Sequence, residues 1–140
     1  MSNTFYQLQG VLDERKGLLE SANSEETESY VVSLHKKGLN KILEKVGEES
    51  TEVILAAKDL AASDSLAQHD SEAKGKSAQA AQLALQSELA GEVADLWFHS
   101  LVMLSHLDMS FSDVEQVIAK RFGLSGIEEK RQRSSKHVSE

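Results

Sequence analysis

The sequence predicts an all-α fold, a bundle of about five helices in a single domain, and three observations support this. The chain of 140 residues contains no proline, the residue that most strongly interrupts helices. Its apolar segments are long and repeat with helical rather than strand periodicity. Hydrophobic residues make up 40% and charged residues 27%, which is typical of a globular domain. We therefore expect one domain with one core over residues 1–140.

The first half of the chain is expected to contain three helices. Apolar residues at helical spacing predict a first helix over residues 4–16. The polar stretch 21–29 then leads to an N-cap, and YVVSLHKK (30–37) predicts a second helix that Gly38 ends. A third helix is predicted from about residue 40 to residue 60, with its apolar residues on one stripe.

The second half is expected to contain two helices after a loop. Residues 61–77 are mostly Ala, Ser, Asp, Lys and Gly, and we expect a flexible loop there. The next segment predicts a long fourth helix over residues 79–107. A fifth helix is predicted over residues 111–123, where Ser112 and Glu115 have the spacing of a capping box.

Composition excludes several classes of function. The absence of cysteine excludes disulfides and thiolate metal sites. The N-terminus lacks the basic and apolar regions of a signal peptide, and no apolar run reaches the roughly 18 residues of a membrane span, so we expect a cytoplasmic protein with no membrane partner. A net charge of −8 argues against nucleic acid as a partner. The polar, basic tail 131–140 is expected to be partly disordered.

The stretch KVGEESTE (45–52) concentrates carboxylates within an otherwise apolar helix. Glu49 follows Val46 by three residues and precedes Val53 by four, so it lies on the apolar stripe. Glu52 lies on the same side, and Glu48 is one turn before it. A solvated acidic face is the ordinary interpretation of such a pattern. Placement on the buried stripe argues against that interpretation, because an unpaired buried carboxylate is costly.

The fourth helix carries a matching polar line. Residues 93–104 are apolar nearly all round, which predicts an interior helix. Glu92, Asp95 and His99 nevertheless recur at helical spacing, and Glu88 extends the line by one turn. A single histidine in such a position, as His99 is, is more often a hydrogen-bonded core residue than a metal ligand. The natural partners of this line are the carboxylates of the third helix.

Four converging carboxylates would need either protons or a cation. Two like charges about 4 Å apart repel by roughly 4 kcal/mol at an effective dielectric constant near 20. An all-oxygen donor set favours Mg²⁺ or Mn²⁺ over zinc, and the absence of E-x-x-H pairs argues against a di-iron centre. Because such cations commonly bind proteins together with substrate phosphates, phosphate chemistry is the leading implication.

Three stretches of the chain together resemble a known family. They are SLHKKGLNKILEKVGEESTEVILAAKD (33–59), GEVADLWFHSLVML (91–104) and VIAKRFGLSGIEEKRQR (117–133). These resemble the phosphoribosyl-ATP pyrophosphatase family of histidine biosynthesis, within the all-α, MazG-like nucleotide pyrophosphohydrolases. The E-E-x-x-E and E-x-x-D pairs mark only the superfamily, whereas the flanking glycine and lysine pattern is more specific.

The resemblance implies a homodimer and Mg²⁺-dependent hydrolysis of the α–β phosphoanhydride of phosphoribosyl-ATP, with Mn²⁺ as a substitute metal. It implies Glu49, Glu52, Glu92 and Asp95 as metal ligands, and Glu48 as a further ligand or a water-orienting base, so that Glu48 and Glu49 are the catalytic carboxylates. The substrate-side residues that it implies are Lys36, Lys37, Lys41, Lys45, Arg121, Ser125 and Lys130.

One departure and two alternatives accompany this interpretation. The connection between the two acidic pairs is longer than is usual in the family, with a polar insertion over about residues 61–87. A longer loop is thermodynamically cheap and need not disturb a site.

The first alternative is a house-cleaning pyrophosphohydrolase of the dUTP or dCTP type. The second is a non-catalytic helical dimer whose acidic line binds a metal for stability or forms a partner surface.

Overall fold

The computed structural model describes residues 2–20, 29–69 and 75–123, and five α-helices account for nearly all of them. The α-helices are α1 (Ser2–Gly17), α2 (Tyr30–Lys37), α3 (Leu39–His69), α4 (Lys76–His106) and α5 (Phe111–Arg121), with a short 3₁₀ helix, η1 (Leu18–Glu20), after α1. The described residues contain no strand, so the predicted all-α class is confirmed. None of the described helices has the length and apolar character needed to cross a membrane.

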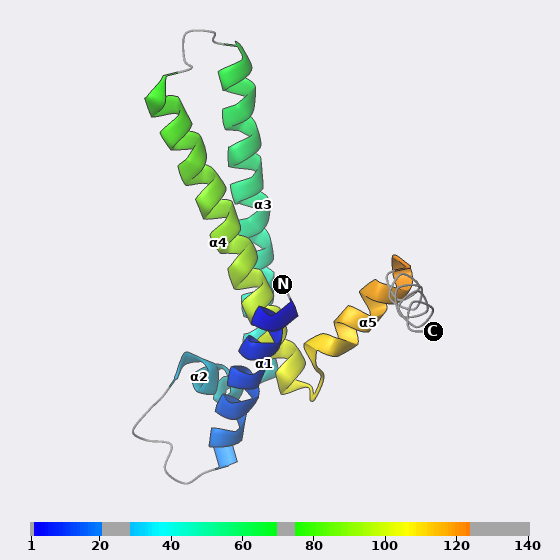
Figure 1. The fold of residues 1–140 in the computed structure, drawn as a ribbon. Coiled ribbons are helices and arrows are strands. Elements are labelled where there is room, and N and C mark those ends of the chain that lie inside the picture. Colours follow the sequence, from blue (N-terminus) through cyan, green and yellow to red (C-terminus); the bar gives the residue numbers. More distant parts are fainter. Residues whose placement is uncertain (1, 21–28, 70–74, 124–140) are drawn as a thin grey trace, which may run out of the picture.

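Two long antiparallel helices, α3 and α4, form a hairpin to which the others attach. Figure 1 shows α1 and α2 against the base of this hairpin and α5 projecting to one side. Four helices meet in the core, whose buried residues are Leu12 from α1, Val31 and Leu34 from α2, Ile42 from α3, and Leu101 and Val102 from α4. The aromatic rings of Phe5 and Phe111 stack at 4.9 Å and attach α5 to α1.

The boundaries of α2 follow the predicted signals. The hydroxyl of Ser29 accepts a hydrogen bond from the backbone N–H of Val32, which caps the first turn. Gly38 has a φ of 87°, a conformation that glycine adopts without steric cost, and its N–H donates to the carbonyls of Leu34 and His35. The chain then turns directly into α3.

The predicted loop over residues 61–77 is wrong for most of its length. Helix α3 continues to His69 and α4 begins at Lys76. The residues in between that the structure leaves undescribed are only 70–74. Alanine is among the commonest residues of this segment, and its high helix propensity favours extension of both helices where no proline stops them. The insertion therefore lengthens the hairpin instead of forming a long loop.

Two further expectations need correction. The capping box of α5 is formed by Ser110 and Asp113 rather than by Ser112 and Glu115, because the helix begins two residues earlier than that pattern requires. The backbone N–H of Ser110 donates to the carboxylate of Asp113 at 2.8 Å. The predicted interior helix over residues 93–104 is buried on only part of its surface: Leu101 and Val102 are buried, whereas Trp97 is 51% exposed although its ring packs 5.0 Å from Phe5. The tail 131–140 lies outside the described residues.

Candidate functional site

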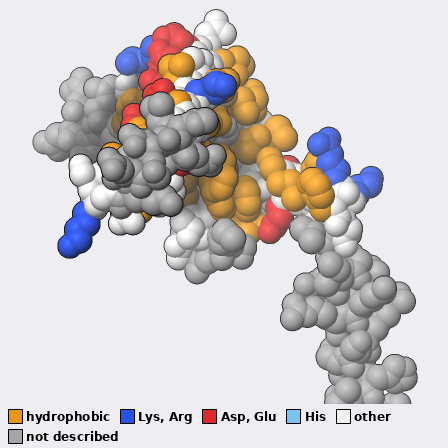
Figure 2. Space-filling model, turned by 90° about the horizontal axis from the view of Figure 1, so that it is seen from above, with side chains coloured by type: hydrophobic (Ala, Val, Ile, Leu, Met, Phe, Trp, Pro, Cys, Tyr) orange, Lys and Arg blue, Asp and Glu red, His pale blue; other side chains and the backbone are white. Residues whose placement is uncertain are grey.

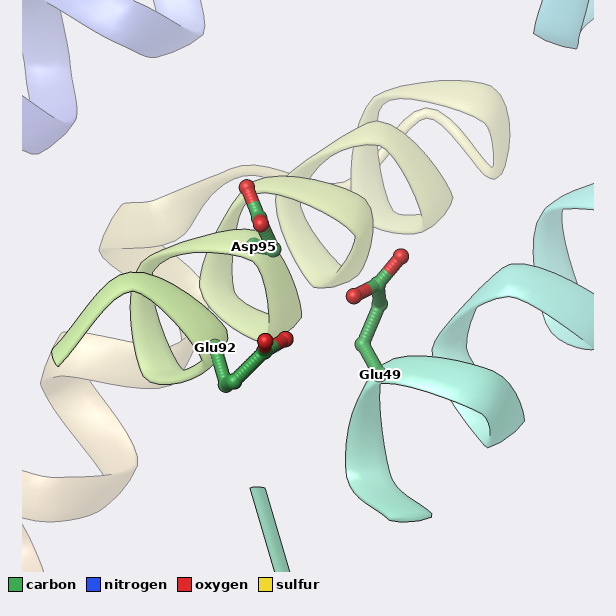
Figure 3. Close-up of side chains that lie close together, drawn as sticks. All are labelled: Glu49, Glu92 and Asp95. Atoms are coloured by element: carbon green, nitrogen blue, oxygen red, sulfur yellow. The ribbon is translucent and has the colours of Figure 1, made fainter. Parts of the chain in front are cut away.

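Three carboxylates converge between α3 and α4 in the half of the hairpin nearer its base. Oxygen atoms of Glu49, Glu92 and Asp95 all lie within 4.8 Å of one another. Figure 3 shows Glu49 reaching from α3 toward Glu92 and Asp95 on α4. Glu49 is only 5% exposed, Glu92 is half-buried and Asp95 is exposed, so the group opens to solvent on one side.

Helical periodicity produces this convergence. Glu49 occupies a position on the inward stripe of α3 where an apolar residue is expected, and Glu92 and Asp95 are one turn apart on α4. Because α3 and α4 run antiparallel and pack along their length, side chains on their facing sides approach each other. Of the four ligands implied by the resemblance, the structure brings these three together and places Glu52 beside them.

Glu52 is an exposed residue one turn after Glu49 and is not one of the three converging carboxylates. A hydrogen-bond contact with Glu49 raises the pKa of Glu52, assisted by burial and by the negative charges of Glu49 and Glu92. The smaller contributions from the charges of Glu49 and Glu92 indicate negative potential at this point of the hairpin. A divalent cation would relieve that potential, and the all-oxygen donor set fits Mg²⁺ or Mn²⁺.

Lys45 neutralises part of this charge within the helix itself. Its Nζ lies 2.5 Å from Glu48 Oε2 and 3.2 Å from Glu49 Oε1. The hydrogen bond with Glu48, together with that to Glu49, raises the pKa of Lys45 and keeps it charged. The same bond to Lys45 lowers the pKa of the Glu48 carboxyl. Glu48 is therefore an ionised, exposed carboxylate at the rim of the group.

His99 lies behind the carboxylates, and both of its ring nitrogens have partners. Its Nδ1 is 2.9 Å from the backbone oxygen of Asp95 and 3.4 Å from Glu49 Oε1. Its Nε2 is 2.9 Å from the hydroxyl of Tyr30 on α2. His99 is 5% exposed, which agrees with the expected hydrogen-bonded core histidine and adds contact with the site. Sequence reasoning missed Tyr30, because no local pattern links it to a residue 69 positions away.

The basic residues implied by the resemblance are distributed unevenly. Lys41 pairs with Glu44 at 2.7 Å on the exposed side of α3, one turn before Lys45. Lys36 and Lys37 are exposed at the end of α2. Arg121 is exposed at the end of α5, which projects away from the hairpin (Figure 1). Ser125 and Lys130 lie outside the described residues.

A pair of stacked histidines was also missed by the sequence interpretation. His35 of α2 and His106 of α4 stack with ring centroids 5.2 Å apart, and their Nδ1 atoms are 3.0 Å apart. His35 is 4% exposed, and its Nε2 has no hydrogen-bond partner among the described atoms. Burial lowers the pKa of His35, and the nearby charges of His106 and Lys16 lower it further.

Comparisons with known proteins identify the family of this chain. The family model described as phosphoribosyl-ATP pyrophosphohydrolase matches residues 6–122. A protein of Burkholderia multivorans named phosphoribosyl-ATP pyrophosphatase is 45% identical over 128 residues, which cover 91% of this chain and 84% of that protein. Proteins of the same name from Hydrogenovibrio crunogenus and Burkholderia cenocepacia are 46% and 43% identical, over 96% and 99% of this chain and 96% and 93% of their own lengths. The chain therefore belongs to the phosphoribosyl-ATP pyrophosphohydrolase family.

Proposed function

We propose that this protein hydrolyses the α–β phosphoanhydride of phosphoribosyl-ATP to phosphoribosyl-AMP and pyrophosphate, the second step of histidine biosynthesis, in the cytoplasm. The observation that carries the proposal is the convergence of Glu49, Glu92 and Asp95 within 4.8 Å across α3 and α4. This convergence occurs within the span that matches a family named for this activity. A group of carboxylates of this kind suits a metal-assisted reaction on a phosphorylated substrate.

The proposed cofactor is Mg²⁺, with Mn²⁺ as a substitute. Glu49, Glu92 and Asp95 would hold the cation, and Glu52 is the proposed fourth ligand because its carboxyl contacts that of Glu49. When bound, the cation supplies polarisation of phosphate oxygens and a lowered pKa for a water molecule. The protein supplies a fixed donor arrangement, since Glu49 is buried and has two nitrogen atoms near its Oε1.

Glu48 is proposed to orient the attacking water and to accept its proton. The pKa of Glu48 lies below its usual range because of Lys45, so its carboxylate is in the proton-accepting form at neutral pH. The same low pKa weakens it as a base, and orientation of the water is therefore expected to be its larger contribution. The lysines Lys36, Lys37, Lys41 and Lys45, with Arg121, Ser125 and Lys130, are proposed to contact the substrate and to stabilise the departing pyrophosphate.

The direct test is incubation of the purified protein with phosphoribosyl-ATP and Mg²⁺, followed by measurement of released pyrophosphate. We expect release that EDTA abolishes and that Mn²⁺ partly restores. A panel of dUTP, dCTP and other nucleoside triphosphates serves as the control. Turnover of any of these at least equal to that of phosphoribosyl-ATP would support a house-cleaning enzyme instead. A metal-dependent melting temperature with no hydrolysis of any nucleotide would support the non-catalytic alternative.

We also propose that the protein is a homodimer that pairs through the apolar side of the hairpin. Leu60 of α3 and Leu89, Val93 and Trp97 of α4 line an apolar groove on the surface. Figure 2 shows hydrophobic side chains gathered on the side of the molecule from which α5 projects. Large hydrophobic side chains such as Leu83 are also strongly exposed, at 65%, which is typical of surfaces that are covered by a partner.

Light scattering coupled to gel filtration tests the dimer. We expect the mass of two chains for the wild type and of one chain for a Leu89→Glu variant, because the new charge would be buried in the groove. The matched control is Glu88→Leu on the neighbouring position of α4. A wild-type mass of one chain at micromolar concentration contradicts the proposal.

A further inference from the structure

A tyrosine and a histidine connect α2 to the candidate metal site. Tyr30 is the first residue of α2 and follows the cap Ser29, which fixes the start of that helix. Its hydroxyl lies 2.9 Å from Nε2 of His99, and the two rings meet edge to face at 5.9 Å. His99 is one turn after Asp95 on α4 and is 5% exposed. The pair therefore joins a half-exposed tyrosine to a buried position directly behind the carboxylates.

The contacts of His99 define which of its nitrogens carries the proton. Nδ1 faces two oxygen atoms, the backbone oxygen of Asp95 at 2.9 Å and Glu49 Oε1 at 3.4 Å. A carbonyl and a carboxylate only accept hydrogen bonds, so Nδ1 must donate. In the neutral ring Nε2 then has a lone pair, and the Tyr30 hydroxyl donates to it. Proton donation thus runs in one direction, from Tyr30 to His99 and from His99 toward the site.

The series of contacts from Tyr30 through His99 ends at Glu49. Its Oε1 lies 3.4 Å from His99 Nδ1 and 3.2 Å from Lys45 Nζ. A carboxylate is planar, so contacts that hold one oxygen restrict the direction of the second oxygen as well. The same N–H of His99 also binds the backbone of Asp95, one of the three converging residues. One nitrogen atom therefore contacts residues of the site on both helices.

We propose that Tyr30 and His99 are positioning residues for the divalent cation: the Tyr30 hydroxyl sets the tautomer of His99, and the Nδ1–H of His99 orients the carboxylate of Glu49. The proposal rests on the proposed metal site, but not on the identity of the substrate. It assigns α2 a role in the site beyond the lysines at its other end. Partners that orient the ligands of a metal site typically change metal affinity by about 10- to 100-fold when they are removed.

The role of the Tyr30 hydroxyl is tested by measuring the affinity for Mn²⁺ in the absence of substrate. Electron paramagnetic resonance detects the free ion. We expect Tyr30→Phe to weaken Mn²⁺ binding by about 3- to 10-fold, less than the usual range because Tyr30 acts through His99. The matched control is Tyr6→Phe. Tyr6 is also partly exposed, and its hydroxyl donates to the side chain of Glu115, but this hydrogen bond joins α1 to α5. Tyr6→Phe should bind Mn²⁺ as the wild type does. Equal affinities for both variants and the wild type would overturn the proposal.

Two substitutions of His99 separate positioning from packing. His99→Gln retains an N–H donor of similar reach, whereas His99→Leu fills the space without a donor. We expect His99→Leu to lose about tenfold or more in Mn²⁺ affinity and His99→Gln to recover part of that loss, with melting temperatures measured to establish folding. If both variants fold and lose affinity equally, the donor has no role and the proposal is wrong.

A metal-independent measurement distinguishes failure of this proposal from failure of the proposed function. Nitrogen-15 spectra of the metal-free protein should show His99 in the Nδ1–H tautomer, with an Nε2 signal that moves in Tyr30→Phe. An Nε2–H tautomer would overturn the proposal whatever the protein hydrolyses. Conversely, a protein that shows the predicted tautomer and Mn²⁺ effects but does not hydrolyse phosphoribosyl-ATP would refute the proposed substrate and leave the positioning pair standing.

Discussion

The two ends of the α3–α4 hairpin differ in what surrounds them. The proximal half, defined here as residues 39–56 and 92–106, packs against other helices and contributes Ile42, Leu101 and Val102 to the core. The distal half, residues 57–69 and 76–91, contains no buried residue among those whose exposure the structure describes. Both halves belong to the same two continuous helices.

This difference indicates what a carboxylate site of this kind needs. Two helices alone leave most of each surface in water, and carboxylates between them would remain hydrated. In the proximal half, Glu49 and His99 are buried, and a hydrogen-bond contact with Glu49, together with the negative charges of Glu49 and Glu92, raises the pKa of Glu52. The site therefore depends on the proximal packing, and the distal half is free to serve another purpose such as contact with a second subunit.

The largest expected effect compares two glutamates one turn apart on α4. Glu92→Gln removes a charge from the converging group and should lower pyrophosphate release from phosphoribosyl-ATP by about 1,000-fold, because an oriented cation contributes several kcal/mol of transition-state stabilisation. Glu88→Gln changes an exposed residue of the distal half and should keep the rate within about twofold. Similar losses in both variants would remove the functional distinction between the halves.

The second effect concerns the stability of the proximal half. Leu101 is 4% exposed and packs in the core where four helices meet. Leu101→Ala should lower the free energy of unfolding by about 2–5 kcal/mol through lost burial and the cavity left behind. Urea unfolding monitored by circular dichroism measures this change in the free energy of unfolding. A loss below about 1 kcal/mol would mean that the proximal packing is looser than its burial indicates.

The third effect is a dependence of folding stability on pH. Its source is His35, which lies where α2 contacts α4. Its pKa in the folded protein is lowered, chiefly by burial, while in the unfolded chain it is about 6.5. The unfolded state therefore binds the proton more strongly, and stability falls as pH decreases through 6.5 toward the lower folded value. The melting temperature should drop between pH 7.5 and 5.5, and His35→Leu should drop less over the same range. Equal slopes would show that His35 is not the group responsible.

The smallest effect is expected from shortening the distal half. Replacing residues 64–84 with a short glycine-containing turn removes the hydrogen bond between Gln82 and Asp64 but no described buried residue. Pyrophosphate release per subunit should stay within about threefold, because loop length changes chain entropy only slightly. A loss of activity with an unchanged melting temperature would show that the distal half contributes to the site.

Sequence reasoning predicted the elements whose signals are local. The spacing of Val46, Glu49 and Val53 on one helix was enough to predict that Glu49 points inward, and the structure shows it buried. The composition of residues 61–77 suggests a loop because the segment is polar, yet its alanines are also the strongest helix formers, and residues 61–69 continue α3. Competition between two nearby serines, Ser110 and Ser112, explains the misplaced capping box.

Contacts between distant residues had no such signal. Tyr30 and His99 are 69 positions apart, and His35 and His106 are 71 apart. Their encounters depend on how α2 docks against α4, which is a property of tertiary packing and not of any periodic pattern. The convergence of the three carboxylates could be predicted only because Glu92 and Asp95 lie one turn apart on α4 and Glu49 lies on α3, the preceding helix along the chain.

The most direct test of the central claim is a crystal structure of the protein grown with Mn²⁺ and recorded at a wavelength where manganese scatters anomalously. The claim is that Glu49, Glu92 and Asp95 hold the divalent cation of the reaction. We expect an anomalous peak at metal–oxygen bonding distance from all three carboxylates, and we expect this peak to be absent in Glu92→Gln. A protein that is active with Mn²⁺ but shows its manganese peak elsewhere, with none between α3 and α4, would contradict the account.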